Sequence, residues 1–83
     1  MHNTEHTMTL MKSCCERVDN IFKYYDALPF ENIKKICFRE YKRLKNKMSD
    51  EEFYDGLIML LNKQTSRHIE IRNGEFVNVD KVD

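Results

Sequence analysis

Apolar residues recur at three- and four-residue steps through the first 48 residues, a pattern that predicts two amphipathic helices. The first helix is expected from about Thr9 to Ala27. Its apolar stripe consists of Met11, Cys14, Cys15, Val18, Ile21, Phe22 and Tyr25. Leu28-Pro29 should end it, because proline disfavours helical backbone in the residue before it and suits the first turn of the next helix. The second helix is expected from Pro29 to about Lys47. Its stripe consists of Phe30, Ile33, Cys37, Tyr41, Leu44 and Met48.

The clearest local signal marks the start of a third helix. Ser49 and Glu52 have the spacing of a capping box, and Met48 and Phe53 occupy the hydrophobic-staple positions around it. The acidic residues that follow Ser49 also favour the positive end of the helix dipole. The buried stripe of this helix is expected at Phe53, Leu57, Leu60 and Leu61, and the helix should fade near residues 62–64.

The C-terminal segment HIEIRNGEFVNVD, residues 68–80, alternates around Asn73-Gly74 and predicts a β-hairpin. Two registers are open. A two-residue turn pairs Ile71 with Phe76 and mixes polar and apolar groups on each face. A three-residue loop with a bulge at Gly74 pairs Ile71 with Glu75, leaves Phe76 outside, and gives one apolar face. That face consists of Ile69, Ile71, Val77 and Val79. We favour the second register because one whole face can then be buried.

The order helix, helix, tight turn, capped helix, hairpin predicts an α+β fold, a three-helix bundle followed by a C-terminal β-hairpin. It resembles a winged helix-turn-helix layout in element order alone. The 83 residues are expected to form a single small domain, because a chain of this length supports one core and contains no long linker. Residues 1–6 and 81–83 are expected to be frayed tails.

Charge is unevenly distributed along a chain whose formal net charge is zero. Residues 1–48 hold ten Lys or Arg against six Asp or Glu, and residues 49–83 hold four against eight. In KKICFREYKRLKNK, residues 34–47, seven of fourteen residues are basic, and the helical period places most of them opposite the apolar stripe. The surface expected to bind a partner consists of Lys35, Phe38, Arg39, Lys42, Arg43 and Lys45, with Arg72 and Phe76 from the hairpin.

Catalytic and metal-binding chemistry is not indicated, so we expect no enzyme, no cofactor and no metal site. With two glycines there is no glycine-rich phosphate loop. The cysteines Cys14, Cys15 and Cys37 lie on predicted core stripes and form no CxxC pair. An odd cysteine count, no signal peptide and no long apolar run predict a cytoplasmic protein without a membrane span. The abundance of Lys, Asn, Ile, Phe and Tyr is typical of AT-rich genomes, such as those of phages and mobile elements.

These observations favour a small regulatory binding protein that docks on a protein partner through the basic outer face of the second helix. The alternative is a DNA- or RNA-binding protein that makes largely phosphate contacts through the same face and the hairpin. The acidic start of the third helix counts against base reading, because that end of a recognition helix meets the DNA. A third hypothesis is a homodimer with Phe38 or the first helix at the interface.

Overall fold

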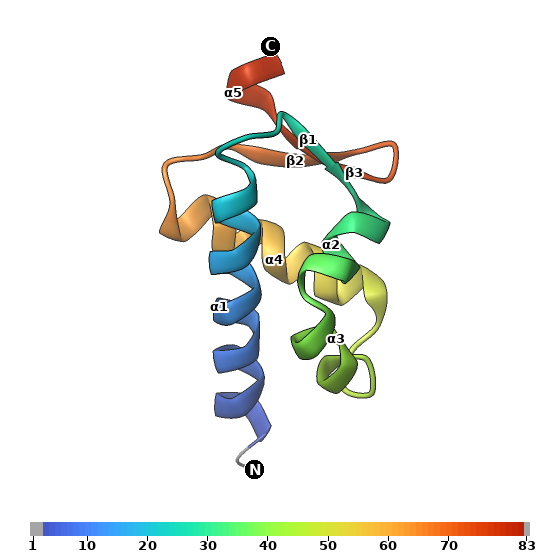
Figure 1. Cartoon of the computed structure of the whole chain (residues 1–83). Helices are drawn as coiled ribbons and strands as arrows, with labels where there is room; N and C mark the ends of the chain where they lie inside the picture. Colours follow the sequence, from blue (N-terminus) through green and yellow to red (C-terminus); the bar gives the residue numbers. More distant parts are fainter. Residues whose placement is uncertain (1–2, 83) are drawn as a thin grey trace.

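The computed structural model describes residues 3–82, which form an α+β fold (Figure 1). In chain order the elements are α1 (Asn3–Ile21), β1 (Ala27–Pro29), α2 (Phe30–Ile36), α3 (Phe38–Leu44), α4 (Asp50–Gln64), β2 (Ile69–Arg72), β3 (Glu75–Asn78) and α5 (Val79–Val82). The strands lie across one end of the helices, and α1 packs against α4 and α3 (Figure 1). Of the segments assigned to tails, residues 3–6 belong to α1 and residues 81–82 to α5, while residues 1, 2 and 83 lie outside the described part.

The sheet has three antiparallel strands in the order β1-β3-β2, so β3 is paired on both sides. Its third strand, β1, falls where the sequence predicted the end of the first helix. That prediction is wrong, because α1 ends at Ile21 and Tyr25 is 54% exposed. Leu28 is buried and lies opposite Phe76 in the sheet. Pairing with β3 therefore holds residues 27–29 extended, and the hairpin gains the extra strand that a lone pair needs for stability.

The predicted second helix is divided at Cys37, which leaves helical geometry with φ −102° and ψ 27°. The Cys37 N–H still donates to the Ile33 carbonyl at 3.0 Å, and its own carbonyl accepts from Tyr41 at 2.8 Å. The apolar stripe therefore continues across the break, and Ile33, Cys37 and Leu44 are all fully buried. The helical stretch ends at Leu44 rather than Lys47.

The hairpin adopts the two-residue turn, so the predicted bulged register is wrong. Ile71 pairs with Phe76, and both turn residues have positive φ, 51° at Asn73 and 76° at Gly74. This is the backbone that two-residue hairpins favour. Phe76 is fully buried instead of exposed, because this register turns its ring toward Phe30. The mixed face does bury one polar residue, Asn78, whose Oδ1 has no hydrogen-bond partner among the described residues.

The start of α4 confirms the predicted capping box. The Glu52 N–H donates to Ser49 Oγ at 3.1 Å, and the Ser49 N–H donates to Glu52 Oε1 at 2.9 Å. Two of the N–H groups that a helix start leaves without backbone partners are thereby satisfied. The helix that follows ends at Gln64, as the sequence predicted.

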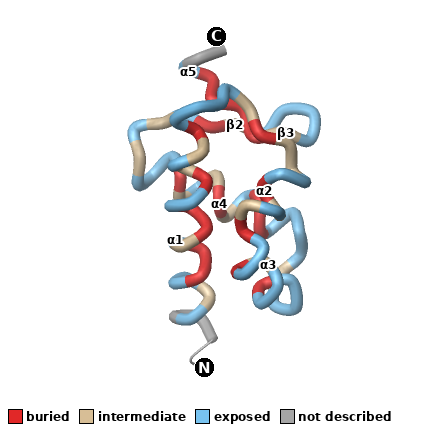
Figure 2. The backbone as a smooth tube through the Cα atoms, in the orientation of Figure 1, coloured by how far each residue is buried: buried red, intermediate tan, exposed pale blue. Residues whose placement is uncertain are grey.

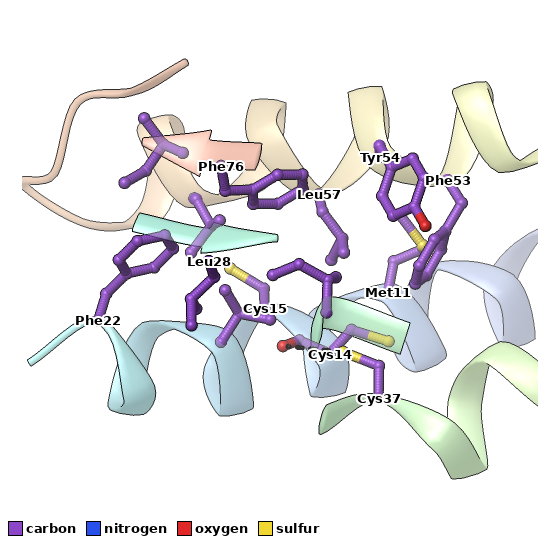
Figure 3. Packing of buried hydrophobic residues seen from close by; sticks show 14 of the residues in the cluster. Met11, Cys14, Cys15, Phe22, Leu28, Cys37, Phe53, Tyr54, Leu57 and Phe76 are labelled. Atoms are coloured by element: carbon purple, nitrogen blue, oxygen red, sulfur yellow. Dashed lines mark hydrogen bonds between the residues drawn. The ribbon is translucent and has the colours of Figure 1, made fainter. Parts of the chain in front are cut away.

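The hydrophobic core lies between α1, the α2–α3 pair, α4 and the inner face of the sheet (Figure 2). All three cysteines are free and buried in it, which confirms their predicted core positions. Cys14 from α1 and Cys37 from the α2–α3 break lie next to each other (Figure 3). The Cys37 thiol donates to the Cys14 carbonyl oxygen at 3.8 Å. The core thus fixes α1 against the segment that carries the basic residues.

Candidate functional site

The outer side of α2 and α3 carries the basic residues that the sequence singled out. We call this the basic surface, and it consists of Lys35, Phe38, Arg39, Lys42, Arg43 and Lys45. All six residues are exposed. None of its five cations forms an ion pair with a carboxylate in the part of the chain that the structure describes. Their charges are therefore directed to solvent or to a partner.

Phe38 is the apolar centre of the basic surface, with 61% of its area exposed. Lys42 Nζ lies 5.7 Å from the centroid of its ring, within the range of a cation–π contact. Phe38 also lines two hollows. One, of about 240 Å³, is lined by Lys35, Lys42 and Lys45 among others, and the other, of about 650 Å³, by Arg39 and Arg43 among others. An exposed ring is thus flanked on both sides by cations.

Glu40 explains why the basic surface contains no acidic residue. It is the one acidic residue in the segment 34–47, and it points inward from α3, with only 4% of its area exposed. Ser13 Oγ donates to Glu40 Oε2 at 2.8 Å, and Arg17 Nε lies 3.4 Å from the same oxygen. This contact to α1 fixes the rotation of α3, so Arg39 and Arg43 face outward. The helical period was a signal for this, because Glu40 lies seven residues after Ile33 and three after Cys37 and so falls on the apolar side of the helix.

The two hairpin residues predicted for the same surface are not part of it. Arg72 is exposed on β2 and pairs with Glu70, with 3.3 Å between Arg72 Nη2 and Glu70 Oε1. It lines neither hollow beside Phe38, and the hairpin lies toward the other end of the molecule from α3 (Figure 1). Phe76 is fully buried, so its predicted role as a surface residue is wrong.

A second surface, which the sequence did not reveal, lies beside the basic one. We call it the acidic groove, a hollow of about 670 Å³ between α2, the start of α4 and β2. It is lined by Phe30, Glu31, Lys34, Asp50, Glu51, Tyr54, Asp55 and Ile71. The rings of Phe30 and Tyr54 stack with centroids 3.9 Å apart and planes 15° apart, which gives the groove an ordered aromatic wall.

Lys34 marks the border between the two surfaces, since it lines both the acidic groove and the smaller hollow beside Phe38. Its Nζ donates to Asp50 Oδ2 at 2.8 Å, and the Tyr41 hydroxyl donates to Asp50 Oδ1 at 2.6 Å. These two hydrogen bonds lower the pKa of the Asp50 carboxyl, and the same contact to Asp50 raises the pKa of Lys34. The charges of Lys34 and Asp50 are therefore satisfied within the fold.

Sequence reasoning attributed the acidic residues at the start of α4 to the capping box and the helix dipole. In the structure Glu52 serves the cap, whereas Glu51 and Asp55 line the groove. Glu51 and Asp55 are one helical turn apart and bear like charge, an arrangement that weakens an isolated helix slightly. The four-residue spacing of Glu51 and Asp55 was the signal in the sequence for an acidic patch on this helix. Glu31, from α2, joins them only through the tertiary fold.

A third hollow, of about 560 Å³, lies between α1 and α4, and four methionines are among the residues that line it. Met8 and Met59 are 47% and 70% exposed on its rim, while Met11 and Met48 are more buried. The sequence placed Met11 and Met48 on core stripes and gave no role to the other two. Thioether side chains are flexible and suit adaptable apolar contacts.

No group of three or more His, Cys, Asp or Glu among the described residues lies in an arrangement that could hold a metal ion. A hydrogen bond with the Cys37 thiol, together with burial, raises the pKa of Cys14, which holds it as the thiol. Within residues 3–82 no helix combines the length and the apolar character needed to cross a membrane.

Comparisons with known proteins found no relative: no family model matches the chain, and neither the curated proteins nor the solved structures contain a match. The interpretation of the site therefore depends on its own residues.

Proposed function

We propose that this chain is a small non-enzymatic regulatory binding protein whose basic surface docks on an acidic region of a protein partner. The observation that carries the proposal is Phe38, an exposed ring flanked by five cations that have no acidic partner among the described residues. Aromatic and arginine side chains are the residue types that most often dominate binding energy at protein interfaces. Complementary charge around such an anchor increases the association rate and the specificity.

We further propose that the fold is a winged helix-turn-helix variant in which α2–α3 and α4 are the two helices of the motif and β2–β3 the wing. The order of the elements supports this, as does the short connection of residues 45–49 between α3 and α4. In such motifs the start of the second helix meets the DNA bases. Here that end carries Asp50, Glu51 and Glu52, whose carboxylates repel phosphates. This supports protein docking over base reading.

The proposal is tested by charge reversal with a matched control. One bait carries Phe38→Ala, Lys42→Glu and Arg43→Glu; the control carries Lys12→Glu and Lys63→Glu, the same change in charge at exposed positions on α1 and α4. Each bait is used for affinity capture from a lysate of the cells that produce the protein. We expect the wild type and the control to retain the same partner and the first variant to lose it. Equal capture by all three baits would show that the basic surface is not the docking site.

The alternative function is nucleic-acid binding through the same surface, with Phe38 stacking on a base and the cations contacting phosphates. The five cations without ion pairs in the described part favour it. Fluorescence anisotropy of labelled random-sequence DNA and RNA, at low and at moderate salt, separates the two functions. Affinity that falls steeply with salt would indicate several phosphate contacts and support the alternative. If neither DNA nor RNA binds even at low salt, the alternative is excluded and docking on a protein partner is retained.

A further inference from the structure

The acidic groove combines two kinds of chemistry that the proposed function does not use. Its wall is aromatic, formed by the stacked rings of Phe30 and Tyr54. Around it lie three exposed carboxylates, Glu31, Glu51 and Asp55, none of which forms an ion pair within residues 3–82. Such a groove fits an apolar or aromatic side chain that is flanked by cations. The side chain would pack on the rings of the wall, and the cations would lie near the carboxylates.

The basic surface of the same chain has that chemistry. Phe38 protrudes with 61% of its area exposed, and Lys42 lies over its ring. Arg39 and Lys35 are exposed beside it. Each copy of the chain therefore carries both halves of a complementary pair: an aromatic side chain among cations, and an aromatic-walled groove among carboxylates.

The two surfaces are also neighbours, since Lys34 lines both. Two complementary surfaces side by side on one chain suit a two-fold pair, in which the basic surface of one copy meets the acidic groove of the other and the reverse contact forms at the same time. Lys34 does not oppose this arrangement, because its charge is already paired with Asp50 at 2.8 Å. Both contacts together involve α2, α3, the start of α4 and Ile71 of β2.

We propose that the acidic groove binds the basic surface of a second copy of this chain, with Phe38 of each copy seated in the groove of the other. A standard interface buries roughly 800 Å² per partner. The exposed area of the chain is 5502 Å², so such an interface takes about one seventh of it. Association hides both surfaces, so an acidic protein partner would compete with the second copy. The inference does not depend on that partner, because self-association is measured on the purified chain alone.

Complementary charge reversal gives the sharpest test. The groove variant carries Glu51→Lys and Asp55→Lys, and the surface variant carries Arg39→Glu and Lys42→Glu. Each variant alone brings like charges together at both contacts of the two-fold pair. A mixture of the two variants restores opposite charges at both contacts. The double variant Lys12→Glu, Lys63→Glu serves as the control for charge change elsewhere, and circular dichroism checks that every variant is folded.

Sedimentation equilibrium over a range of concentrations gives the oligomeric state and the dissociation constant. We expect a wild-type dimer that weakens with added salt, a dissociation constant raised roughly tenfold or more in each variant alone, and recovery in the 1:1 mixture. The control should dimerise like the wild type. A wild type that stays monomeric at all concentrations overturns the proposal. So does a dimer that persists in both variants, which would place the interface elsewhere, or growth beyond the dimer, which would exclude the two-fold arrangement.

Discussion

Replacing Phe76 by alanine tests both the register of the hairpin and the composition of the core. The ring is fully buried and makes edge-to-face contacts with Phe30 and Tyr54, with centroids 5.9 Å away in each case. Truncating such a residue costs about 3–5 kcal/mol, the sum of lost burial and the cavity left behind. A chain of 83 residues has a free energy of unfolding of roughly 4–12 kcal/mol. We therefore expect Phe76→Ala to remove a quarter or more of the total stability.

The measurement is urea-induced unfolding followed by far-UV circular dichroism, which gives the free energy of unfolding and its dependence on urea. Phe76→Leu is the milder companion variant, expected to cost about 1–2 kcal/mol and to remain folded if the alanine variant does not. Phe38→Ala is the matched control, because the same ring is removed from an exposed position. At protein concentrations where the chain is monomeric, it should change the free energy of unfolding by no more than about 0.5 kcal/mol.

The reasoning fails if Phe76→Ala and Phe38→Ala have the same small effect. That result would place Phe76 in solvent, as the bulged three-residue loop requires. A large loss of stability in Phe76→Ala but not in Phe38→Ala supports the observed pairing of Ile71 with Phe76.

Three further predictions concern the charged network, the helix cap and the thiols. Asp50→Asn should lower the free energy of unfolding near neutral pH by less than about 1 kcal/mol. Two hydrogen bonds lower the pKa of this carboxyl in the folded state, so its contribution is present above the ordinary pKa of 3.8 and is lost as the pH falls further. Urea titrations should show that the deficit of the variant shrinks as the pH is lowered below 3.8, and a deficit that is the same at neutral and at acidic pH would contradict this. Ser49→Ala should cost about 1 kcal/mol in the same assay, because the Glu52 N–H loses its acceptor, and an unchanged midpoint would exclude that role. Cys14, Cys15 and Cys37 should react with a disulfide reagent only on unfolding, because all three are buried; immediate reaction of the native protein would disprove their burial.

The local sequence predicted those features whose causes lie within a few residues. The capping box of Ser49 and Glu52 and the helix that follows are as predicted, because donor and acceptor are three residues apart. The core positions of the cysteines also followed from the local apolar period. For the same reason the period identified which side of the helical segment around Phe38 is exposed.

Features that depend on residues distant in the chain were missed or wrongly predicted. Leu28 became part of a strand because it lies opposite Phe76, almost fifty positions later, and no local pattern signals such a partner. The hairpin that pairs with this third strand has the register that buries Phe76. The same register also buries one polar residue, Asn78. The alternation of apolar and polar residues favoured the register with a uniformly apolar face, because it was applied to the two hairpin strands alone, without β1.

The basic surface and the acidic groove show the same difference between local and long-range causes. The sequence by itself determined the basic surface, apart from Arg72 and Phe76, because residues 35–45 are close in the chain and the helical period continues across the break at Cys37. Only the tertiary structure decided that Glu40 meets Ser13 and Arg17 of α1, and that Glu31, Asp55 and Ile71 meet in one groove beside that surface. The physical reason is that one helix fixes directions within its own length, whereas a groove between α2, α4 and β2 exists only once long-range packing has placed the three elements together.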